Sequence, residues 1–155
     1  RKAGRIINIS SVGGRITFPV YSVYHATKWA VEGFSESLQF ELRPFNIDVK
    51  LVEPAAIKTD FYSRSKDVFQ KKGLSDYDTY EKVTVTNTNK FGEDAPGPEV
   101  VAKTIYKAAI SRCKKMRYPS STQGKILLFI RKIIPLRWFL FIIRSTVENG
   151  YKKDK

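Results

Sequence analysis

The amino-acid sequence predicts an α/β fold in which helices cover both faces of a parallel sheet. Three segments within about 50 residues support this prediction. The β-branched run 5–10 ends in Ser-Ser-Val-Gly-Gly, as expected for a buried strand that runs into a loop. Apolar residues spaced three or four apart predict a helix over 24–42, and the run 48–53 predicts a second strand. Strand, helix and strand in this order form a βαβ unit, whose two strands are parallel.

The helix over 24–42 is expected to pack on the sheet through one apolar stripe, because its apolar residues recur with the helical period. Pro44 marks its end. His25, the only histidine of the chain, is expected on the helix surface rather than in a catalytic role. The stripe expected to be buried consists of Ala26, Ala30, Val31, Phe34, Leu38 and Leu42.

The remaining elements are less regular. Residues 60–97 are polar and have no sustained period, so they are predicted to form a surface excursion, and such loops often carry substrate contacts. Pro98 followed by Glu99 predicts a helix start. Residues 117–119 are predicted to form one more short strand.

Composition excludes several classes of protein. The chain has 155 residues, 42% of them hydrophobic, so a wholly disordered chain is excluded. Its single cysteine, Cys113, excludes an internal disulfide and a Cys-based zinc site, and we expect an inert, buried or half-buried thiol and no metal centre. The formal net charge of +13 is uneven, because residues 112–155 hold 12 of the 28 basic residues and two of the 15 acidic ones. This asymmetry points to an anionic partner for the tail.

The tail combines positive charge with apolar residues. Residues 125–144 contain 14 apolar residues, worth roughly −4 to −8 kcal/mol on membrane insertion, but three central cations cost roughly 7 to 10 kcal/mol. We therefore expect two short helices, divided at Pro135, that do not span a membrane. Two alternatives remain: a lid or dimer element packed on the protein itself, or a helix pair resting on an anionic membrane surface. The location expected is the cytoplasm, with peripheral membrane contact as an option.

One tyrosine–lysine pair is a candidate for chemistry. Tyr24 and Lys28 lie one helical turn apart, where the cation can stabilise a phenolate. The spacing alone is weak evidence, because chance predicts about one such pair and the chain has three. Context selects this pair, since it opens a helix inside the βαβ unit and follows the strand-terminal Ser10 and Ser11. The other two pairs are Tyr62/Lys66 and Tyr151/Lys155.

These motifs resemble the catalytic part of the short-chain dehydrogenase/reductase family. The matching stretches are Ile-Ile-Asn-Ile-Ser-Ser-Val-Gly-Gly at 6–14, Tyr-His-Ala-Thr-Lys at 24–28, Ala-Val-Glu-Gly-Phe-Ser-Glu-Ser-Leu at 30–38 and Val-Glu-Pro-Ala-Ala-Ile-Lys-Thr at 52–59. Their order and spacing are together highly specific. The resemblance implies a partial Rossmann-like, doubly wound sheet. Its boundaries would be 1–124 for the C-terminal part of a dinucleotide-binding catalytic domain, and 125–155 for a lid or membrane-surface helix pair.

The resemblance also implies roles by position. Tyr24 would be the general acid or base, Lys28 would lower its pKa and hold the nicotinamide ribose, and Ser11 would bind the substrate oxygen. The cofactor would be NAD or NADP, a choice the sequence leaves open. Besides Tyr24 and Lys28, the residues implied to contact it are Pro54, Ala55, Ile57 and Thr59.

Two departures from the family pattern stand out. Ala55 occupies a position where the family usually has glycine, which is acceptable if its backbone φ is negative. No Gly-rich phosphate-binding turn occurs in the sequence. We therefore interpret the chain as the C-terminal part of an enzyme, and expect it to be inactive in isolation.

The expected reaction interconverts a hydroxyl and a carbonyl on a small-molecule substrate. A lipophilic substrate of steroid, retinoid or fatty-chain type is favoured by the aromatic and aliphatic tail, and the complete enzyme is expected to be a homo-oligomer. The alternative is a non-catalytic membrane- or polyanion-binding module built around the basic tail. Nucleic acid is not expected as a partner, because the apolar bulk of 126–143 does not suit a phosphate-tracking groove.

Overall fold

A parallel sheet of three strands forms the centre of the protein. The computed structural model describes residues 3–59 and 77–151. Within them the strands β1 (Gly4–Ile9), β2 (Ile47–Glu53) and β3 (Arg117–Pro119) lie side by side in chain order, and both neighbouring pairs are parallel. All three predicted strands are therefore confirmed, within one residue at each end.

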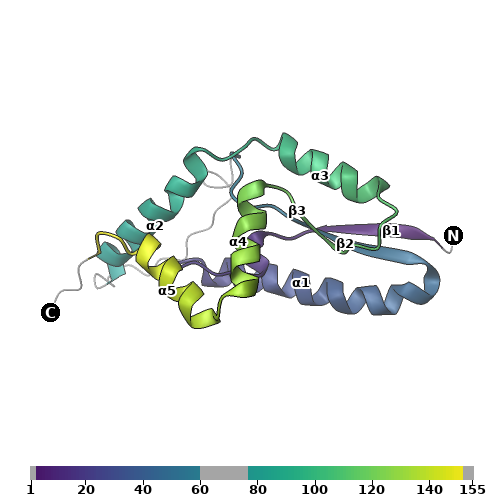
Figure 1. Cartoon of the computed structure of the whole chain (residues 1–155), viewed down its shortest axis with the longest axis horizontal. Helices are drawn as coiled ribbons and strands as arrows, with labels where there is room; N and C mark the ends of the chain where they lie inside the picture. The colour runs from purple at the N-terminus through teal and green to yellow at the C-terminus, as the bar shows by residue number, and fades with distance from the viewer. Residues whose placement is uncertain (1–2, 60–76, 152–155) are drawn as a thin grey trace.

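Helices cover both faces of the sheet (Figure 1). The 21-residue helix α1 (Ser22–Leu42) packs on one face, and α3 (Glu99–Ile110) packs on the other. The α3 side is apolar, because Val52, Ala108 and Tyr118 form a buried cluster there. This arrangement confirms the α/β, doubly wound character predicted from the sequence. Two short 3-10 helices, η1 (Val12–Gly14) and η2 (Arg43–Phe45), follow β1 and α1.

The face that α1 buries differs from the predicted one. Its buried residues are His25, Glu32 and Ser35, whereas Phe34 of the predicted apolar stripe is 61% exposed and Ala26 and Ala30 are also exposed. The stripe prediction was therefore wrong for these residues. The physical reason is that α1 lies over strand ends and a loop whose polar groups need hydrogen-bond partners; for example, Asn8 Nδ2 donates to Ser35 Oγ at 2.9 Å.

One helix was not predicted. Residues 78–93, inside the expected surface excursion, form the helix α2 (Asp78–Glu93) beside the C-terminal helix (Figure 1). Its packing is largely polar, so no apolar period marks it in the sequence. Asn87 Nδ2, for instance, donates to the backbone oxygens of Val147 and Asn149 at 3.0 and 2.9 Å. Residues 60–76 lie outside the described residues.

The tail forms the two short helices predicted from Pro135. These are α4 (Thr122–Ile133) and α5 (Leu136–Val147). Ser121 caps the N-terminus of α4, because its Oγ accepts a hydrogen bond from Gly124 N at 3.0 Å. No helix in the described part of the chain is long and apolar enough to cross a membrane. The division of the chain after residue 124 remains a prediction.

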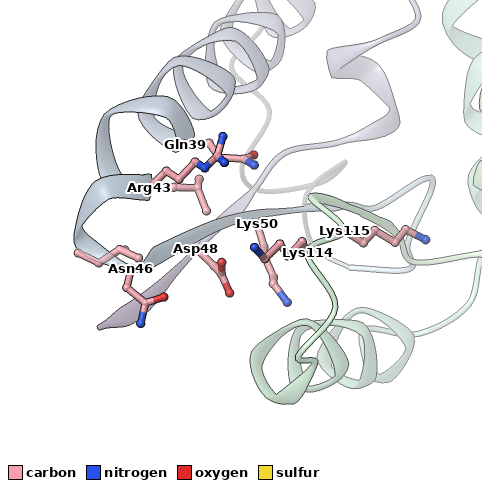
Figure 2. Close-up of a pocket in the computed structure, with 9 residues that line it drawn as sticks. Gln39, Arg43, Asn46, Asp48, Lys50, Lys114 and Lys115 are labelled. Atoms are coloured by element: carbon pink, nitrogen blue, oxygen red, sulfur yellow. The ribbon is translucent and has the colours of Figure 1, made fainter. Parts of the chain in front are cut away.

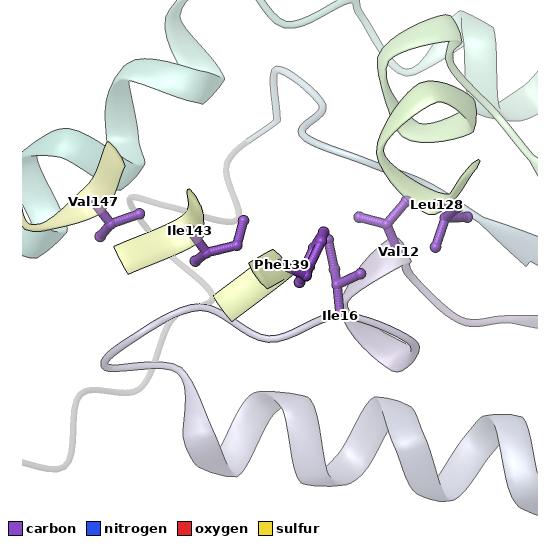
Figure 3. Packing of buried hydrophobic residues seen from close by; sticks show 6 residues of the cluster. All are labelled: Val12, Ile16, Leu128, Phe139, Ile143 and Val147. Atoms are coloured by element: carbon purple, nitrogen blue, oxygen red, sulfur yellow. The ribbon is translucent and has the colours of Figure 1, made fainter. Parts of the chain in front are cut away.

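The tail helices share a core with the loop after β1. Figure 3 shows this cluster, in which two residues of the loop region meet one residue of α4 and three of α5. The tail is thus packed against the segment that follows the predicted catalytic serine. We call it the tail cluster, and it consists of Val12, Ile16, Leu128, Phe139, Ile143 and Val147. Cys113, by contrast, is exposed, so the expectation of a buried or half-buried thiol was wrong.

Candidate active site

Ser11 lies directly beyond the carboxyl end of β1. Its Oγ accepts a hydrogen bond from Gly13 N at 3.0 Å, which caps η1, and donates to the backbone oxygen of Pro54 at 3.2 Å. Val12 N also donates to Pro54 O, at 2.9 Å. The loops that follow β1 and β2 are therefore fastened to each other at the edge of the sheet where open α/β folds bind ligands.

Tyr24 and Lys28 reach the same edge from the first turns of α1. Lys28 Nζ donates to the backbone oxygen of Ile9, the last residue of β1, at 3.3 Å and lies 6.0 Å from the centroid of the Tyr24 ring. The side chains of Tyr24 and Ser11 are hydrogen-bonded to each other. The structure thus brings together all three residues for which the sequence implied catalytic roles.

The electrostatics of this group differ from the expectation. Burial raises the pKa of Tyr24, and this effect outweighs the hydrogen bond with Ser11, which lowers it. Burial lowers the pKa of Lys28. The Lys28 ammonium donates to the backbone oxygen of Ile9. That Lys28 lowers the pKa of Tyr24 stays a prediction.

The residues implied to contact the cofactor follow β2. Pro54 and Ala55 are half-buried, Ile57 is buried and Thr59 is exposed. Ala55 is not among the described non-glycine residues with positive φ, which are Val20 and Asn46. The condition under which alanine can replace glycine at this position is therefore met.

His25 is the functional-region residue that sequence reasoning missed. It is 5% exposed, its Nδ1 lies 2.8 Å from Gly13 O, and its Nε2 lies 2.9 Å from Phe18 N. The expectation of a surface position was therefore wrong. A signal was present, because His25, Lys28, Glu32 and Ser35 are spaced by three or four residues and form a polar stripe on the sheet side of α1.

A cluster of charged side chains lies on the α1 side of the sheet. Glu53 at the end of β2 is fully buried and lies 3.3 Å from Arg15 Nη1 and 3.6 Å from Arg117 Nε. Burial and the neighbouring Glu32 raise the pKa of Glu53, while Arg15 and Arg117 lower it, and the net direction is upward. The cluster links α1, β2, β3 and the loop after β1.

The most prominent pocket lies elsewhere. A cavity of about 470 Å³ lies between the C-terminal end of α1, the first half of β2 and the loop before β3. Figure 2 shows residues that line it, among them Arg43, Asp48 and Lys114. It lies at the amino end of β2, whereas ligands of parallel sheets bind at the carboxyl ends. We therefore assign the chemistry to the Ser11, Tyr24 and Lys28 group.

Comparisons with known proteins agree with this fold. The family profile described as short chain dehydrogenase matches residues 1–68, a range that includes Ser11, Tyr24 and Lys28. The uncharacterized oxidoreductase YusZ of Bacillus subtilis (strain 168) is 40% identical over 140 residues, which are 87% of this chain and 50% of that protein. A 3-ketodihydrosphingosine reductase of Bacteroides thetaiotaomicron is 52% identical over 63 residues, which are 39% of this chain and 23% of that protein.

A solved structure extends the likeness over nearly the whole chain. A short-chain dehydrogenase from Streptomyces avermitilis is 28% identical with a TM-score of 0.70, and the match covers 98% of this chain and 53% of that one. The chain spans about half the length of the relatives it matches. Sequence motifs, parallel fold, site geometry and these matches all agree, and the chain belongs to the short-chain dehydrogenase/reductase family.

Proposed function

We propose that the protein is an NAD(P)-dependent oxidoreductase that interconverts a hydroxyl and a carbonyl. The observation that carries this proposal is the meeting of Ser11, Tyr24 and Lys28 at the carboxyl ends of β1 and β2. The order of these residues in the family motif and their contacts in space support the same roles. Family membership does not favour the alternative of a non-catalytic binding module.

Tyr24 transfers the proton in this proposal. In the reducing direction its hydroxyl gives a proton to the carbonyl oxygen as the substrate carbon accepts a hydride, and the product is an alcohol. A nicotinamide dinucleotide supplies that hydride when bound, or accepts one in the reverse direction. Ser11 donates a hydrogen bond to the substrate oxygen in place of the one it now gives to Pro54 O. Lys28 supplies positive charge next to the developing phenolate.

The residues at this edge fit the nicotinamide end of such a cofactor. An ammonium has three N–H donors, and within the described ranges the one hydrogen-bond acceptor of Lys28 is Ile9 O, which leaves donors for ribose hydroxyls. Ala55 is not among the residues with positive φ, so an alanine fits this position of the loop after β2 without backbone strain. The proposed cofactor contacts are Tyr24, Lys28 and the loop after β2, with Pro54, Ala55, Ile57 and Thr59.

We propose a lipophilic substrate of steroid, retinoid or fatty-chain type. The tail helices support this, because Phe139 and Leu128 share one buried apolar cluster with Val12, the residue after Ser11. Apolar side chains therefore lie beside the proposed oxyanion-binding residue. The 3-ketodihydrosphingosine reductase among the relatives, a protein named for a long-chain keto substrate, favours the same substrate class.

We further propose that the tail rests on an anionic membrane surface. The outer face of α5 supports this. At 100° per residue, Trp138 and Phe141 lie on the side of the helix away from the buried Phe139 and Ile143. Arg137 flanks these two aromatic side chains, as expected for a helix that rests on an anionic surface. We call the exposed apolar set of both helices the tail patch, and each member is between 43% and 63% exposed. The tail patch consists of Ile126, Phe129, Ile133, Leu136, Trp138, Leu140, Phe141 and Ile142.

A homo-oligomer is proposed on separate grounds. Three large apolar side chains of α1 are strongly exposed in the single chain, with exposed fractions of 61% for Val23, 61% for Phe34 and 77% for Phe40. Exposed apolar side chains of this kind favour contact with another protein surface. A second copy of the chain is the occupant we propose.

Substitution of Tyr24 tests the proposed activity. Tyr24→Phe in the full-length protein that contains these residues should reduce turnover of a carbonyl substrate about 10²- to 10⁴-fold, because proton transfer typically contributes that much. Tyr151→Phe is the matched control, because Tyr151 belongs to another Tyr-x-x-x-Lys pair and its ring packs on Tyr80. Tyr62, of the third pair, lies outside the described residues, and Tyr62→Phe is likewise expected to retain most activity. Equal turnover by Tyr24→Phe and the wild type would refute the assignment.

A further inference from the structure

The histidine next to the proposed catalytic tyrosine has both ring nitrogens occupied. His25 Nδ1 lies 2.8 Å from Gly13 O, and Phe18 N donates to His25 Nε2 at 2.9 Å. A backbone oxygen can only accept and a backbone N–H can only donate, so the partners fix the tautomer: Nδ1 carries the hydrogen and Nε2 is bare. His25 is therefore held as the neutral imidazole.

These two bonds connect the loop after β1 to the start of α1. Both backbone polar groups of Gly13 are hydrogen-bonded: its N–H donates to Ser11 Oγ and its oxygen accepts from His25. A Cβ added at Gly13 would come within 3.0 Å of His25 Nδ1 and 3.1 Å of Tyr24 Cε1, so the loop and the helix are in direct contact. The rings of Tyr24 and His25 also pack edge to face, with centroids 5.7 Å apart.

We propose that His25 is a positioning residue whose neutral imidazole, bonded to Gly13 O and Phe18 N, sets the geometry between Ser11 and Tyr24. The proposal rests on the proposed function, since it concerns the residues that would transfer the proton and bind the substrate oxygen. The Gly13 bond acts on Ser11 through the cap of η1. The Phe18 bond anchors the far end of the loop, whose middle carries Ile16 into the tail cluster.

Protonation of His25 would break this arrangement. A proton on Nε2 would face the Phe18 N–H, so two donors would meet and repel each other. This repulsion would displace the loop, whereas the absence of an acceptor, as in an asparagine at this position, would leave Phe18 N in place. Burial lowers the pKa of His25, and its hydrogen bond to the Gly13 oxygen raises it, with a net direction downward.

The other titratable or charged groups that face His25 from its own helix and its N-cap are Tyr21, Tyr24 and, further along the same face, Lys28 and Glu32. From the loop, Arg15 is the charged residue, and it pairs with Glu53. Protonation of His25 itself is the event that would break its hydrogen bond with Phe18 N. Activity should therefore fall as the pH drops through the pKa of His25.

Two amide substitutions separate the two bonds. The amide of asparagine reaches the position of Nδ1, so His25→Asn keeps a donor for Gly13 O, whereas the amide of glutamine reaches the position of Nε2, so His25→Gln keeps only the acceptor for Phe18 N. In the full-length protein we expect His25→Asn to keep kcat within about threefold and His25→Gln to lose about 10- to 100-fold, because small misplacements of reacting groups cost that much. The KM for the nicotinamide dinucleotide should change little in either variant. Each variant controls for the other, since both remove the ring and differ by one methylene.

The pH profile distinguishes positioning from simple stabilisation. The wild type should show an acidic limb that is absent from His25→Asn, which cannot titrate. If both variants retain full activity, or if both lose it equally while remaining folded, the Gly13 bond does not position Ser11 and the proposal is wrong.

A measurement without substrate keeps this test separate from the proposed activity. Nitrogen-15 spectra of the His25 ring, assigned by its loss in His25→Asn, should report the Nδ1–H tautomer and a pKa below that of a free histidine. Exchange of the Gly13 amide should stay slow in His25→Asn and become faster in His25→Gln. The Nε2–H tautomer, or identical Gly13 exchange in both variants, would overturn the proposal. An inactive wild type with the expected spectra would refute the proposed function alone.

Discussion

Arg117 in β3 donates a hydrogen bond from Nε to the carboxylate of Glu32 in α1 at 2.9 Å, across 85 residues of sequence. The same guanidinium pairs with the more exposed Glu36, one helical turn further on, and approaches the fully buried Glu53. The helix that carries Tyr24 and Lys28 is thereby fixed to the last strand of the sheet. Compensation of the buried charge is incomplete, because Glu32 Oε1 and Glu53 Oε2 have no hydrogen-bond partner among the described residues.

Glu53 should make stability depend on pH in a defined direction. Its pKa in the folded protein is raised above the usual 4.5, so the folded state holds this proton more tightly than the unfolded state does. The contribution of Glu53 to the free energy of unfolding is therefore greatest at low pH and falls as the pH rises above about 4.5. We expect the stability of the wild type relative to Glu53→Gln, measured by urea denaturation, to decrease as the pH rises above about 4.5.

Glu36→Gln is the control for this experiment. It removes a carboxylate from the same guanidinium, but at a side chain that is 55% exposed. A wild-type advantage over Glu53→Gln that grows with rising pH would show that the arginine pairs outweigh burial, and would contradict the prediction.

Substitution of two phenylalanines of α5 should change stability by very different amounts. Phe139 is 2% exposed within the tail cluster and lies under the guanidinium of Arg131, whereas Phe141 on the outer face is 61% exposed. Phe139→Ala should lower the free energy of unfolding by about 3 to 5 kcal/mol, because it leaves a cavity. Phe141→Ala should change it by about 0.5 kcal/mol or less. If chemical denaturation shows the same loss in free energy of unfolding for both variants, another protein surface must cover Phe141.

The tail patch should bind anionic vesicles. We expect binding to vesicles containing phosphatidylserine, weaker binding as salt is added, and little binding to neutral vesicles, because each basic residue near such a surface contributes about 1 kcal/mol. Arg137 is exposed, while Arg144 is paired with Glu148 at 2.8 Å, so Arg137→Gln should weaken binding more than Arg144→Gln. Flotation or sedimentation with vesicles measures the effect.

Phe141→Ala connects this prediction with the previous one. It should reduce vesicle binding while leaving stability unchanged, because the same ring is exposed and apolar. If vesicles are not bound at low salt, or if deleting residues 125–155 leaves binding unchanged, the tail is a lid or dimer element instead. If the wild type is a dimer and Phe141→Ala dissociates it, the tail is a dimer element and not a lid.

The chain of 155 residues, expressed on its own, should bind nicotinamide dinucleotides poorly. Pyrophosphate binding in this kind of fold depends on backbone N–H groups at a Gly-rich turn that opens a helix, and the sequence has no such turn. A fluorescence titration with the reduced dinucleotide, on protein whose helix content is verified by circular dichroism, measures this. Saturable binding at about micromolar concentration, or turnover of a model carbonyl, would contradict the prediction.

Local patterns were sufficient for much of the fold. The β-branched runs at 5–10 and 48–53, the helical period after Tyr24 and the break at Pro135 depend on neighbouring residues only, so the sequence by itself determined three strands, α1 and the two tail helices. It also singled out Tyr24 and Lys28, because this pair opens a helix inside the βαβ unit at the ligand-binding edge of the sheet. The choice of Ser11 came from the resemblance to the family.

Only the tertiary structure decided which side of each helix is buried and which polar groups meet. Periodicity shows that α1 has two stripes, but the choice of the polar one depends on the loop at Gly13 and the Arg117 side chain, which come from distant parts of the sequence. The same holds for α2, whose Asn87 contacts the backbone of the C-terminal segment instead of an apolar core. Burial of a polar side chain is favourable only when partners with matching donors and acceptors face it, and those partners exist only once the chain has folded.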